Sequence, residues 1–425
     1  MKKTGVLFFT FMLMMLAVFP GFSYAQTTTV SPGLIAYIGT DYNVYTTSAQ
    51  GGTPATLTKD ASVTKAPQQI YQWPTWSSDG QLAYFRSGID ATSGSPVTEV
   101  LVSADGKTPG ASAYVGANEA FTYANWSPKP CGADCRDLAL LLSDPSGLSV
   151  KLVRWQNGAG TSTTIGAGAP FYYTWSPEGA RLITQQNNQQ FEIYDTSTSK
   201  FTSTLTQTPG ATFTPDWSPT DDRLLLGVKN QSSTDLVIAN GTDVKTLAAG
   251  QVNPIWFSWS PDGKQVAYID RQGPLIVLDA ASGAVVTKSS AEGVLAFFWS
   301  PDSQHIAYLT PPPKSNGSLT AAKRPVSLAQ QSQPAQTLAW SVINVADGTN
   351  RQYGSFQPSD ELLYLLVYFD QFAVSHHVWS PDSRDLVYSE TTALGRHAID
   401  VLDTTQANAA PQVIADGLIG IWSFS

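Results

Sequence analysis

A short turn motif recurs along this chain and constrains its fold more than any other feature. In the stretch WFSWSPDGKQVAYID, Trp256 to Asp270, the segment Ser260 to Gly263 suits a type I turn, because serine can hydrogen-bond back into the turn and proline fixes φ at its second position. β-Branched and aromatic residues stand on both sides of the turn, as β-strands favour. The motif therefore predicts a β-hairpin.

Variants of this hairpin return along the chain, each marked by a Trp-Ser pair. The eight tryptophans are Trp76, Trp126, Trp175, Trp217, Trp259, Trp299, Trp379 and Trp422. Their intervals are 50, 49, 42, 42, 40, 80 and 43 residues, and all but the interval of 80 match one four-stranded propeller blade. Each unit is interpreted as an inner strand ending in Trp-Ser, a turn and three further strands.

The two ends of the chain complement one another. Near the N-terminus GLIAYIG, NVYTTSA and ATLTK are typical of strands two to four, whereas the C-terminal IGIWSFS is a first strand alone. Pairing the two ends in one blade would close a ring and leave no exposed sheet edge. The pattern predicts an all-β, eight-bladed β-propeller over residues 26–425, with seven blades as the alternative count.

The 80-residue interval holds only one set of later strands, so its surplus predicts two insertions. Residues 311–336 are rich in Pro, Ser and Gln, which favours a flexible loop. In residues 359–375, Ser359 is placed to cap a helix and is followed by acidic residues and a dense apolar face. We expect a short helix beside the mouth of the central channel, with an elongated strand as the alternative.

The first 25 residues have the pattern of a secretory signal peptide, with Lys2 and Lys3, an apolar run, and small residues before a cleavage site. A membrane anchor is the alternative for this segment. We expect a secreted or periplasmic monomer without a membrane span once the signal is removed. Without the two lysines the chain has 22 basic and 33 acidic residues, and this net charge of -11 argues against nucleic-acid binding.

Two cysteines, Cys131 and Cys135, lie close together in the sequence CGADC. An oxidising compartment would allow a disulfide that staples this one loop. A redox-active pair would more typically have C-x-x-C spacing, and a metal site would need more ligands than the loop offers. The structural disulfide is the favoured interpretation.

The pattern WSPDGKQVAYI followed by an IVLD strand resembles the TolB-type, WD-repeat-like propeller repeat. The same repeat type occurs in the propeller domains of dipeptidyl-peptidase-like and prolyl-oligopeptidase-like proteins. The resemblance covers nearly all of the chain after the predicted signal and implies the propeller fold. Because families with this repeat include periplasmic scaffolds, peptidase gatekeeping domains and a few polysaccharide lyases, it implies no single function. TolB-type periplasmic proteins carry a separate N-terminal domain, whereas strand patterns here begin shortly after the predicted cleavage site.

The repeated tryptophans are predicted to pack between blades, because each removes a large apolar area from water at the same place in every unit. Positions that vary at a fixed register are the candidate ligand-binding residues. Three residues before the repeated tryptophan, strand alternation places side chains on the opposite face, near one mouth of the channel. The candidates at this position are Trp73, Tyr123, Tyr172, Trp256 and His376.

A second register, one residue before each repeated tryptophan, is polar in consecutive units and includes Asn125 and Asp216. Together with the aromatic residues this polar arc could orient a sugar ring or an extended peptide. The alternative is that the aromatic side chains pack between blades like any others.

The sequence indicates no enzyme class, cofactor or metal site. A linked peptidase would need a G-x-S-x-G nucleophile elbow, which the chain lacks. A glycosidase needs facing carboxylates, but the inner-strand register offers only Asp216, and the aspartates of the repeated turns are explained by turn chemistry. His376 and His377 are adjacent, so on a strand they would face opposite sides and should not share a metal.

We therefore predict a non-enzymatic propeller that binds a protein, peptide or glycan across the face bearing the channel mouth. One alternative is a polysaccharide lyase-like enzyme that uses His376 with the channel aromatics. The other is a purely structural envelope protein, in which side chains would close the channel.

Overall fold

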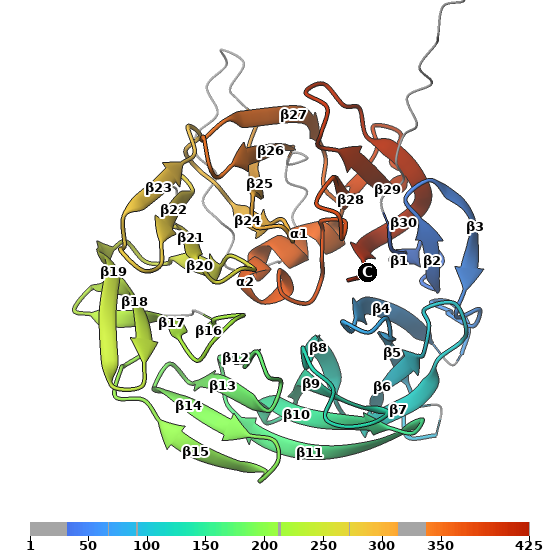
Figure 1. The fold of residues 1–425 in the computed structure, drawn as a ribbon. Helices are drawn as coiled ribbons and strands as arrows, with labels where there is room; N and C mark the ends of the chain where they lie inside the picture. Colours follow the sequence, from blue (N-terminus) through green and yellow to red (C-terminus); the bar gives the residue numbers. More distant parts are fainter. Residues whose placement is uncertain are drawn as a thin grey trace, which may run out of the picture. The chain divides into compact units, whose positions relative to one another are not determined.

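A computed structural model describes residues 32–66, 68–90, 92–210, 214–271, 273–312 and 337–424. These residues belong to one compact unit. The predicted signal peptide, residues 1–25, and nearly all of the predicted loop 311–336 lie outside them. Figure 1 shows the described part as a ring of antiparallel sheets with two short helices inside the ring. Neither helix of this part is long and apolar enough to cross a lipid bilayer.

Six sheets have four strands each, and hydrogen-bonded neighbours in them are consecutive in sequence. The first three contain β4 (Gln69–Trp76), β5 (Leu82–Ile89), β6 (Pro96–Ser103) and β7 (Ala111–Ala117); β8 (Ala120–Trp126), β9 (Cys135–Asp144), β10 (Gly147–Gln156) and β11 (Ala159–Ala167); and β12 (Phe171–Trp175), β13 (Arg181–Gln186), β14 (Gln190–Asp195) and β15 (Lys200–Thr204). The next three contain β16 (Asp216–Trp217), β17 (Leu224–Asn230), β18 (Ser233–Asn240) and β19 (Asp243–Gln251); β20 (Trp256–Trp259), β21 (Gln265–Ile269), β22 (Ile276–Asp279) and β23 (Val285–Lys288); and β24 (Ala296–Trp299), β25 (His305–Thr310), β26 (Leu338–Asn344) and β27 (Asn350–Phe356).

The remaining sheet has six strands and joins the two ends of the chain. Its order is β28 (Asp385–Thr391), β29 (His397–Asp403), β30 (Gln412–Trp422), β1 (Ile35–Gly39), β2 (Val44–Ser48) and β3 (Gly51–Thr56). The first half of β30 pairs with β29, and its second half pairs with β1, where Ile35 stands opposite Trp422. The prediction that the N- and C-terminal strands close the ring in one sheet is confirmed.

The eight-bladed prediction is wrong, and the propeller has seven blades when each sheet is counted as one. The count by Trp-Ser motifs treats the strand ending at Trp422 as separate from the last strand of the unit before it. In the structure both are one continuous strand of 11 residues, β30, so the two units share the six-stranded sheet. Local repeats could not reveal this, because continuity of a strand across two units depends on the partners on both of its sides.

The Trp379 unit also lacks the regular inner strand that the repeat predicts. Its tryptophan forms only an isolated bridge with Leu386. The preceding chain forms α1 (Asp360–Val367) and α2 (Phe369–Phe372), and the amide of His376 still donates to the carbonyl of Phe372 at 2.7 Å. Residues that form the inner strand in other units are thus used here by the end of a helical segment.

The repeated tryptophans lie between neighbouring units. Seven of the eight are buried, and Trp299 is partly buried. Three indole nitrogens donate to the carbonyl one residue before the repeated tryptophan of the preceding unit: Trp126 to Thr75 at 3.1 Å, Trp175 to Asn125 at 3.1 Å, and Trp379 to Phe298 at 2.9 Å. These bonds connect successive units at three of the boundaries around the ring.

Cationic side chains add to this contact between units. The guanidinium of Arg181 lies 4.8 Å from the ring centroid of Trp217, and that of Arg223 lies 4.7 Å from that of Trp259. Each arginine belongs to the unit before the tryptophan that it covers, so the stacking joins two blades.

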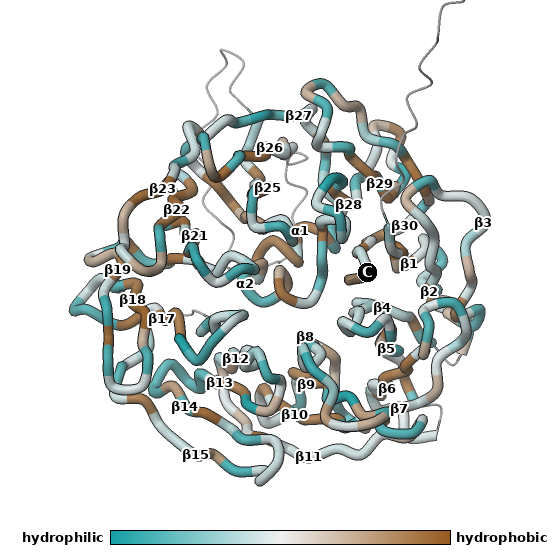
Figure 2. Tube along the Cα trace, in the orientation of Figure 1, coloured by the Kyte–Doolittle hydropathy of each residue, from teal (hydrophilic) through white to brown (hydrophobic). Residues whose placement is uncertain are grey.

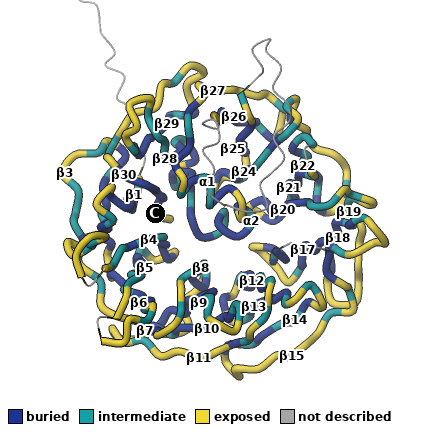
Figure 3. Tube along the Cα trace, turned by 180° about the vertical axis from the view of Figure 1, so that it is seen from behind, coloured by how far each residue is buried: buried dark blue, intermediate teal, exposed yellow. Residues whose placement is uncertain are grey.

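The outermost strands of the blades are the least hydrophobic and the most exposed. Brown, hydrophobic stretches lie mainly in the middle strands of the blades, such as β17, β18 and β22, whereas the outer strands β7 and β11 are mostly pale or teal (Figure 2). Viewed from behind, the exposed stretches follow the rim at β11, β15 and β19 (Figure 3). The core is therefore the space between blades and around the inner strands.

Candidate functional site

The helical insertion occupies the channel mouth. Ser359 caps α1, since its hydroxyl accepts a hydrogen bond from the amide of Leu362 at 3.1 Å. Figure 1 shows α1 and α2 inside the ring. Phe369 and Phe372 of α2 are both 1% exposed, so the apolar face of the insertion is buried against the blades.

Hydrogen bonds attach the insertion to inner strands of separate blades. The Tyr123 hydroxyl of β8 donates to the carbonyl of Gln371 at 2.8 Å. The Thr75 hydroxyl of β4 donates to the carbonyl of Ser375 at 3.0 Å. The Asp370 carboxylate accepts from the amide of Thr214, just before β16, at 3.3 Å. The insertion is therefore fixed to the channel wall by hydrogen bonds from three blades.

The predicted mouth aromatics pack against this insertion. The ring of Trp73 lies 5.3 Å from that of Tyr364 and 5.0 Å from that of Phe372, centroid to centroid. The ring of Tyr123 lies 5.2 Å from that of Phe372. Trp256 is buried, and its ring stacks on that of Phe369 with the two centroids 6.3 Å apart.

Tyr172 is partly buried beside the same insertion. Burial raises the pKa of its hydroxyl, and the charge of Asp370 adds to that rise. The structure thus brings the five predicted register positions to one mouth, where four of them contact or face the helices and the fifth, His376, follows them in the chain.

His376 is completely buried. Its Nδ1 atom lies 2.8 Å from the Ser375 hydroxyl oxygen, and its ring packs on Phe372 at 4.8 Å. Burial lowers its pKa from 6.5 to about 3, with a further contribution from neighbouring His377. The imidazole is therefore neutral at ordinary pH and has no accessible nitrogen with which to abstract a proton from a bound polysaccharide.

The predicted polar arc is used in contacts between inner strands. The Asp216 carboxylate accepts a hydrogen bond from the amide of Trp259 at 3.0 Å, and the Thr174 hydroxyl donates to the carbonyl of Pro215 at 2.8 Å. Asn125 is buried, and its carbonyl accepts the indole hydrogen bond described above. Burial raises the pKa of Asp216 to about 7, and the charge of Asp370 also raises it.

Asp370 is a channel acid that sequence reasoning missed. The inner-strand register of the repeat contains one carboxylate, Asp216, so the sequence predicts a single acid in the channel. Asp370 reaches the channel from an insertion that has no repeat register, so no periodic signal could have placed it there.

An open cleft remains between α1 and the inner strand β4, with a volume of about 240 Å³. Its lining residues are Ile38, Tyr42, Ile70, Tyr71, Gln72, Trp73, Asp360, Glu361, Tyr364, Leu418 and Ile419. Of the predicted binding residues, only Trp73 lines this cleft. Tyr42 and Trp73 have left-handed backbones, with φ of 62° and 48°. Such conformations are rare for bulky residues and are often found at functional sites.

The cleft residues come from four separate sequence regions, 38–42, 70–73, 360–364 and 418–419. Tyr42 and Tyr71 lie outside the register of the repeated tryptophans, and Tyr364 and Glu361 belong to the insertion. Two sequence signals pointed to this region: the register that selected Trp73, and the acidic residues and dense apolar face after Ser359, which predicted a helix rather than a pocket wall.

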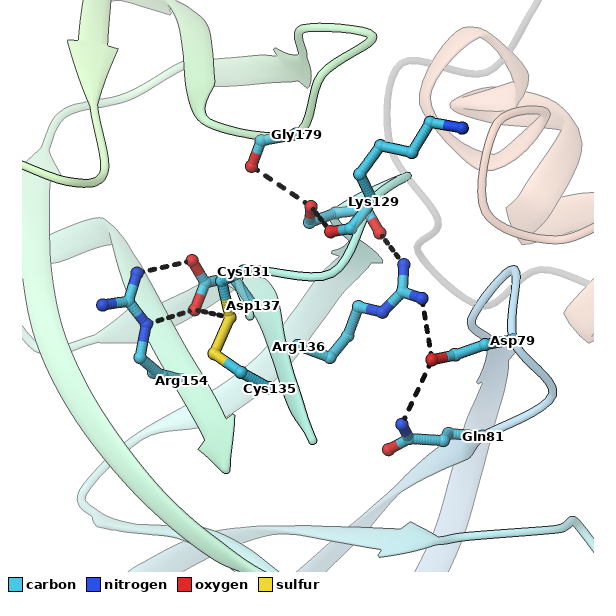
Figure 4. The surroundings of a disulfide bond; sticks show 10 residues. Asp79, Gln81, Lys129, Cys131, Cys135, Arg136, Asp137, Arg154 and Gly179 are labelled. Atoms are coloured by element: carbon cyan, nitrogen blue, oxygen red, sulfur yellow. Dashed lines mark hydrogen bonds and ion pairs between the residues drawn. A yellow bond between two sulfur atoms is a disulfide. The ribbon is translucent and has the colours of Figure 1, made fainter. Parts of the chain in front are cut away.

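The cysteines form a second notable cluster, away from the channel mouth. Cys131 and Cys135 are joined by a disulfide. Beside it, Asp137 accepts two hydrogen bonds of 2.8 Å from the Arg154 guanidinium, while Arg136 reaches Asp79 of the preceding blade at 2.8 Å (Figure 4). Asp137 and the two sulfur atoms lie close together, but sulfur atoms bonded to one another do not supply thiolate ligands.

The fold defines this protein as a closed, all-β propeller with a helical insertion at one channel mouth. No family model matches the sequence, and no curated protein matches it. Distant structural matches include TolB, WD40-type and other propellers.

One match is a solved structure described as the eukaryotic initiation factor, with a TM-score of 0.52, 12% identity, and coverage of 92% of this chain and 98% of that chain. TolB from Acinetobacter baumannii matches with a TM-score of 0.40, 12% identity, and coverage of 84% and 82%. A chain of the mitotic checkpoint complex matches with a TM-score of 0.42, 15% identity, and coverage of 70% and 84%. At such identities the similarity concerns the fold alone.

Proposed function

We propose that this protein is a secreted or periplasmic binding module that receives a segment of a protein, peptide or glycan in the cleft between α1 and β4. The cleft carries this proposal, because it is a concave site with aromatic walls and a few polar groups, as ligand sites usually are. The remainder of the mouth is filled by α2, so the cleft is the accessible part of the predicted binding face.

The size of the cleft limits what it receives. Its volume of about 240 Å³ is below the range of about 300 to 1,000 Å³ that is common for small-molecule sites. It suits one side chain or one sugar ring of a longer ligand. The net charge of the whole chain, -9, disfavours nucleic acid as that ligand.

A purely structural role is the second candidate, and the packing of α2 favours it. Phe369 and Phe372 close much of the channel mouth with side chains, which is the arrangement that a scaffold without a ligand would have. The lyase alternative has no comparable support, since His376 is buried.

The experiment is a glycan and peptide array probed with wild-type protein and two variants. Ile70→Trp would fill the cleft from its β4 wall. Ala120→Trp is the matched control, because it makes a similar change at the corresponding place of the next inner strand, at an exposed residue outside the cleft.

We expect at least one ligand class to bind the wild type and Ala120→Trp, and to bind Ile70→Trp at least tenfold more weakly. Equal binding by all three proteins would remove the cleft as the site. Absence of any bound ligand on both arrays would favour the structural candidate.

A further inference from the structure

The cleft walls combine aromatic rings with acidic groups. Asp360 and Glu361, in the first turn of α1, form one side, and Trp73 and Tyr364 form a corner in which their rings lie 5.3 Å apart at 44°. None of the residues that line the cleft is lysine, arginine or histidine. The cleft therefore has negative charge and π-faces without a positive group of its own.

Glu361 is the most informative of these residues. It is only partly exposed, and its Oε2 atom is buried without a hydrogen-bond partner among the described residues. A buried carboxylate oxygen of this kind is costly unless a donor or a positive charge lies nearby. Burial raises the pKa of Glu361, and the charge of Asp360 adds to the rise, while a backbone hydrogen bond and the charge of His397 oppose it without cancelling it. A cation in the cleft would offset this cost.

The aromatic walls favour the same kind of occupant. A cation held against the faces of Trp or Tyr rings is attracted by their quadrupoles, most strongly when water is excluded. Asp360 is exposed at the edge of the cleft, where it can attract a positive charge from solution. An anionic group, such as a phosphate or a uronic acid, would meet two like charges.

We propose that the cleft recognises a cationic side chain, lysine or arginine, of a partner peptide, which inserts between the Trp73–Tyr364 corner and the acidic residues of α1. This inference rests on the proposed binding function and specifies its ligand class. The stem of either side chain is apolar and would lie along Ile70 and Ile419, while its charged end meets Glu361.

The test uses four short peptides of one design: acetyl-Gly-Lys-Gly-amide, its arginine analogue, and its glutamine and glutamate analogues. Binding to the full chain is measured by calorimetric titration and by ligand-observed NMR. Glu361→Gln keeps the size of the side chain and removes its charge. Glu292→Gln is the matched control, since Glu292 is exposed before β24 and does not line the cleft.

We expect the lysine and arginine peptides to bind the wild type and Glu292→Gln, and to bind Glu361→Gln about tenfold more weakly, since hydrogen bonds to charged groups are among the stronger ones. The glutamine and glutamate peptides should bind at least tenfold more weakly than the lysine peptide. Raising the salt concentration from about 50 to about 500 mM should weaken binding, because the attraction is electrostatic.

Either of two results with the peptides would by itself overturn the inference. One is equal binding of the lysine and glutamine peptides; the other is unchanged lysine binding by Glu361→Gln. If a neutral glycan binds the wild type and not Ile70→Trp while the lysine peptide does not bind, the cleft function stands and the cationic ligand is wrong. If the lysine peptide binds Ile70→Trp as well as the wild type, binding occurs elsewhere and both proposals fail.

Discussion

Several side chains at the channel mouth owe their chemistry to the groups packed on them. His376 is an ordinary imidazole by sequence, yet the rings of Trp73 and Phe372 and the Ser375 hydroxyl surround it. Burial shifts the pKa of Asp216 in the opposite direction, upwards to about 7, since burial disfavours whichever form is charged. Both effects make stability depend on pH, with opposite signs.

The histidine effect predicts a loss of stability in acid. The folded pKa of His376 is lowered to about 3 from 6.5, so below about pH 6.5 the unfolded chain binds a proton that the folded chain does not. Its stabilising contribution is complete above pH 6.5 and is lost as the pH falls towards 3. We expect wild-type protein to lose up to about 2 kcal/mol of unfolding free energy from this residue between pH 7.5 and pH 5.

His376→Gln should reduce that pH-dependent loss, as measured by urea denaturation at the two pH values. It should not abolish it, because burial also lowers the pKa of His377 to about 4. Asp216, whose pKa is raised, is present in both proteins, so its contribution to the pH dependence of stability cancels in the comparison. His305→Gln is the control at a partly exposed site. The same pH-dependent loss in His376→Gln and wild type would contradict the prediction.

The packing around the repeated tryptophans can be tested with two glycines. Gly106 and Gly241 both have left-handed backbones, with φ of 64° and 59°. A Cβ atom at Gly106 would lie 2.1 Å from Cη2 of Trp76, whereas one at Gly241 would meet no heavy atom of the described residues within 4 Å. We expect Gly241→Ala to cost about 1 to 2 kcal/mol for the backbone alone. Gly106→Ala should cost about 1 to 3 kcal/mol more. Equal losses in chemical denaturation would show that the Trp76 ring moves freely.

At the scale of elements, the helical insertion is the feature that departs from the regular four-stranded repeat. Its two helices interrupt the repeat, take residues from an inner strand and fill the channel mouth. A helix of eight residues is too short to be stable alone, so α1 depends on its cap and on burial of its apolar face. Ser359 both caps the helix and attaches it to the ring, because its hydroxyl also donates to the carbonyl of Leu418 in β30 at 2.9 Å.

Ser359→Ala should therefore loosen α1 specifically. Loss of an N-cap hydroxyl typically costs about 1 to 2 kcal/mol, and here it also leaves the Leu418 carbonyl without this donor. We expect faster hydrogen exchange at the amides of α1 while the blade strands keep their protection. Ser282→Ala, in the exposed turn after β22, should change neither. Unchanged exchange in α1 would show that packing alone holds the helix.

At the scale of the whole molecule, β30 is the closing strand of the ring. It supplies the last strand of one unit and the first strand of the next, so the two chain ends depend on each other. Without its second half, β1 would present an unpaired edge, which favours association with other chains.

A chain ending at Gly417 should lose cooperative folding. The deletion removes the strand partners of residues Ile35 to Ile38. It also removes Trp422, whose side chain is fully buried in the complete chain. We expect a broad thermal transition and concentration-dependent oligomers in size-exclusion chromatography. A chain shortened only by Ser425 should behave as the full chain does. Cooperative unfolding of the Gly417 truncation as a monomer would show that the remaining sheets form a stable ring without closure.

The sequence by itself determined the repeating hairpin, the four-strand unit and the pairing of the two ends. These depend on turn chemistry and strand alternation, which act over a few neighbouring residues and so leave a periodic trace. Trp73, Tyr123 and Trp256, which share one register of the repeat, all contact the helical insertion. Strand alternation does not explain this for Trp73, because its left-handed backbone, with φ of 48°, interrupts the pairing of β4 with β5.

Only the tertiary structure decided the number of sheets and the shape of the site. Seven rather than eight sheets result from one continuous strand with partners on both sides. The cleft results from an insertion that folds back on inner strands far away in sequence, which buries His376 and brings Glu361 beside Trp73. Neither outcome follows from local propensity, because the number of sheets depends on the partners that β30 finds on its two sides, and the cleft depends on which distant surfaces bury the apolar face of the insertion.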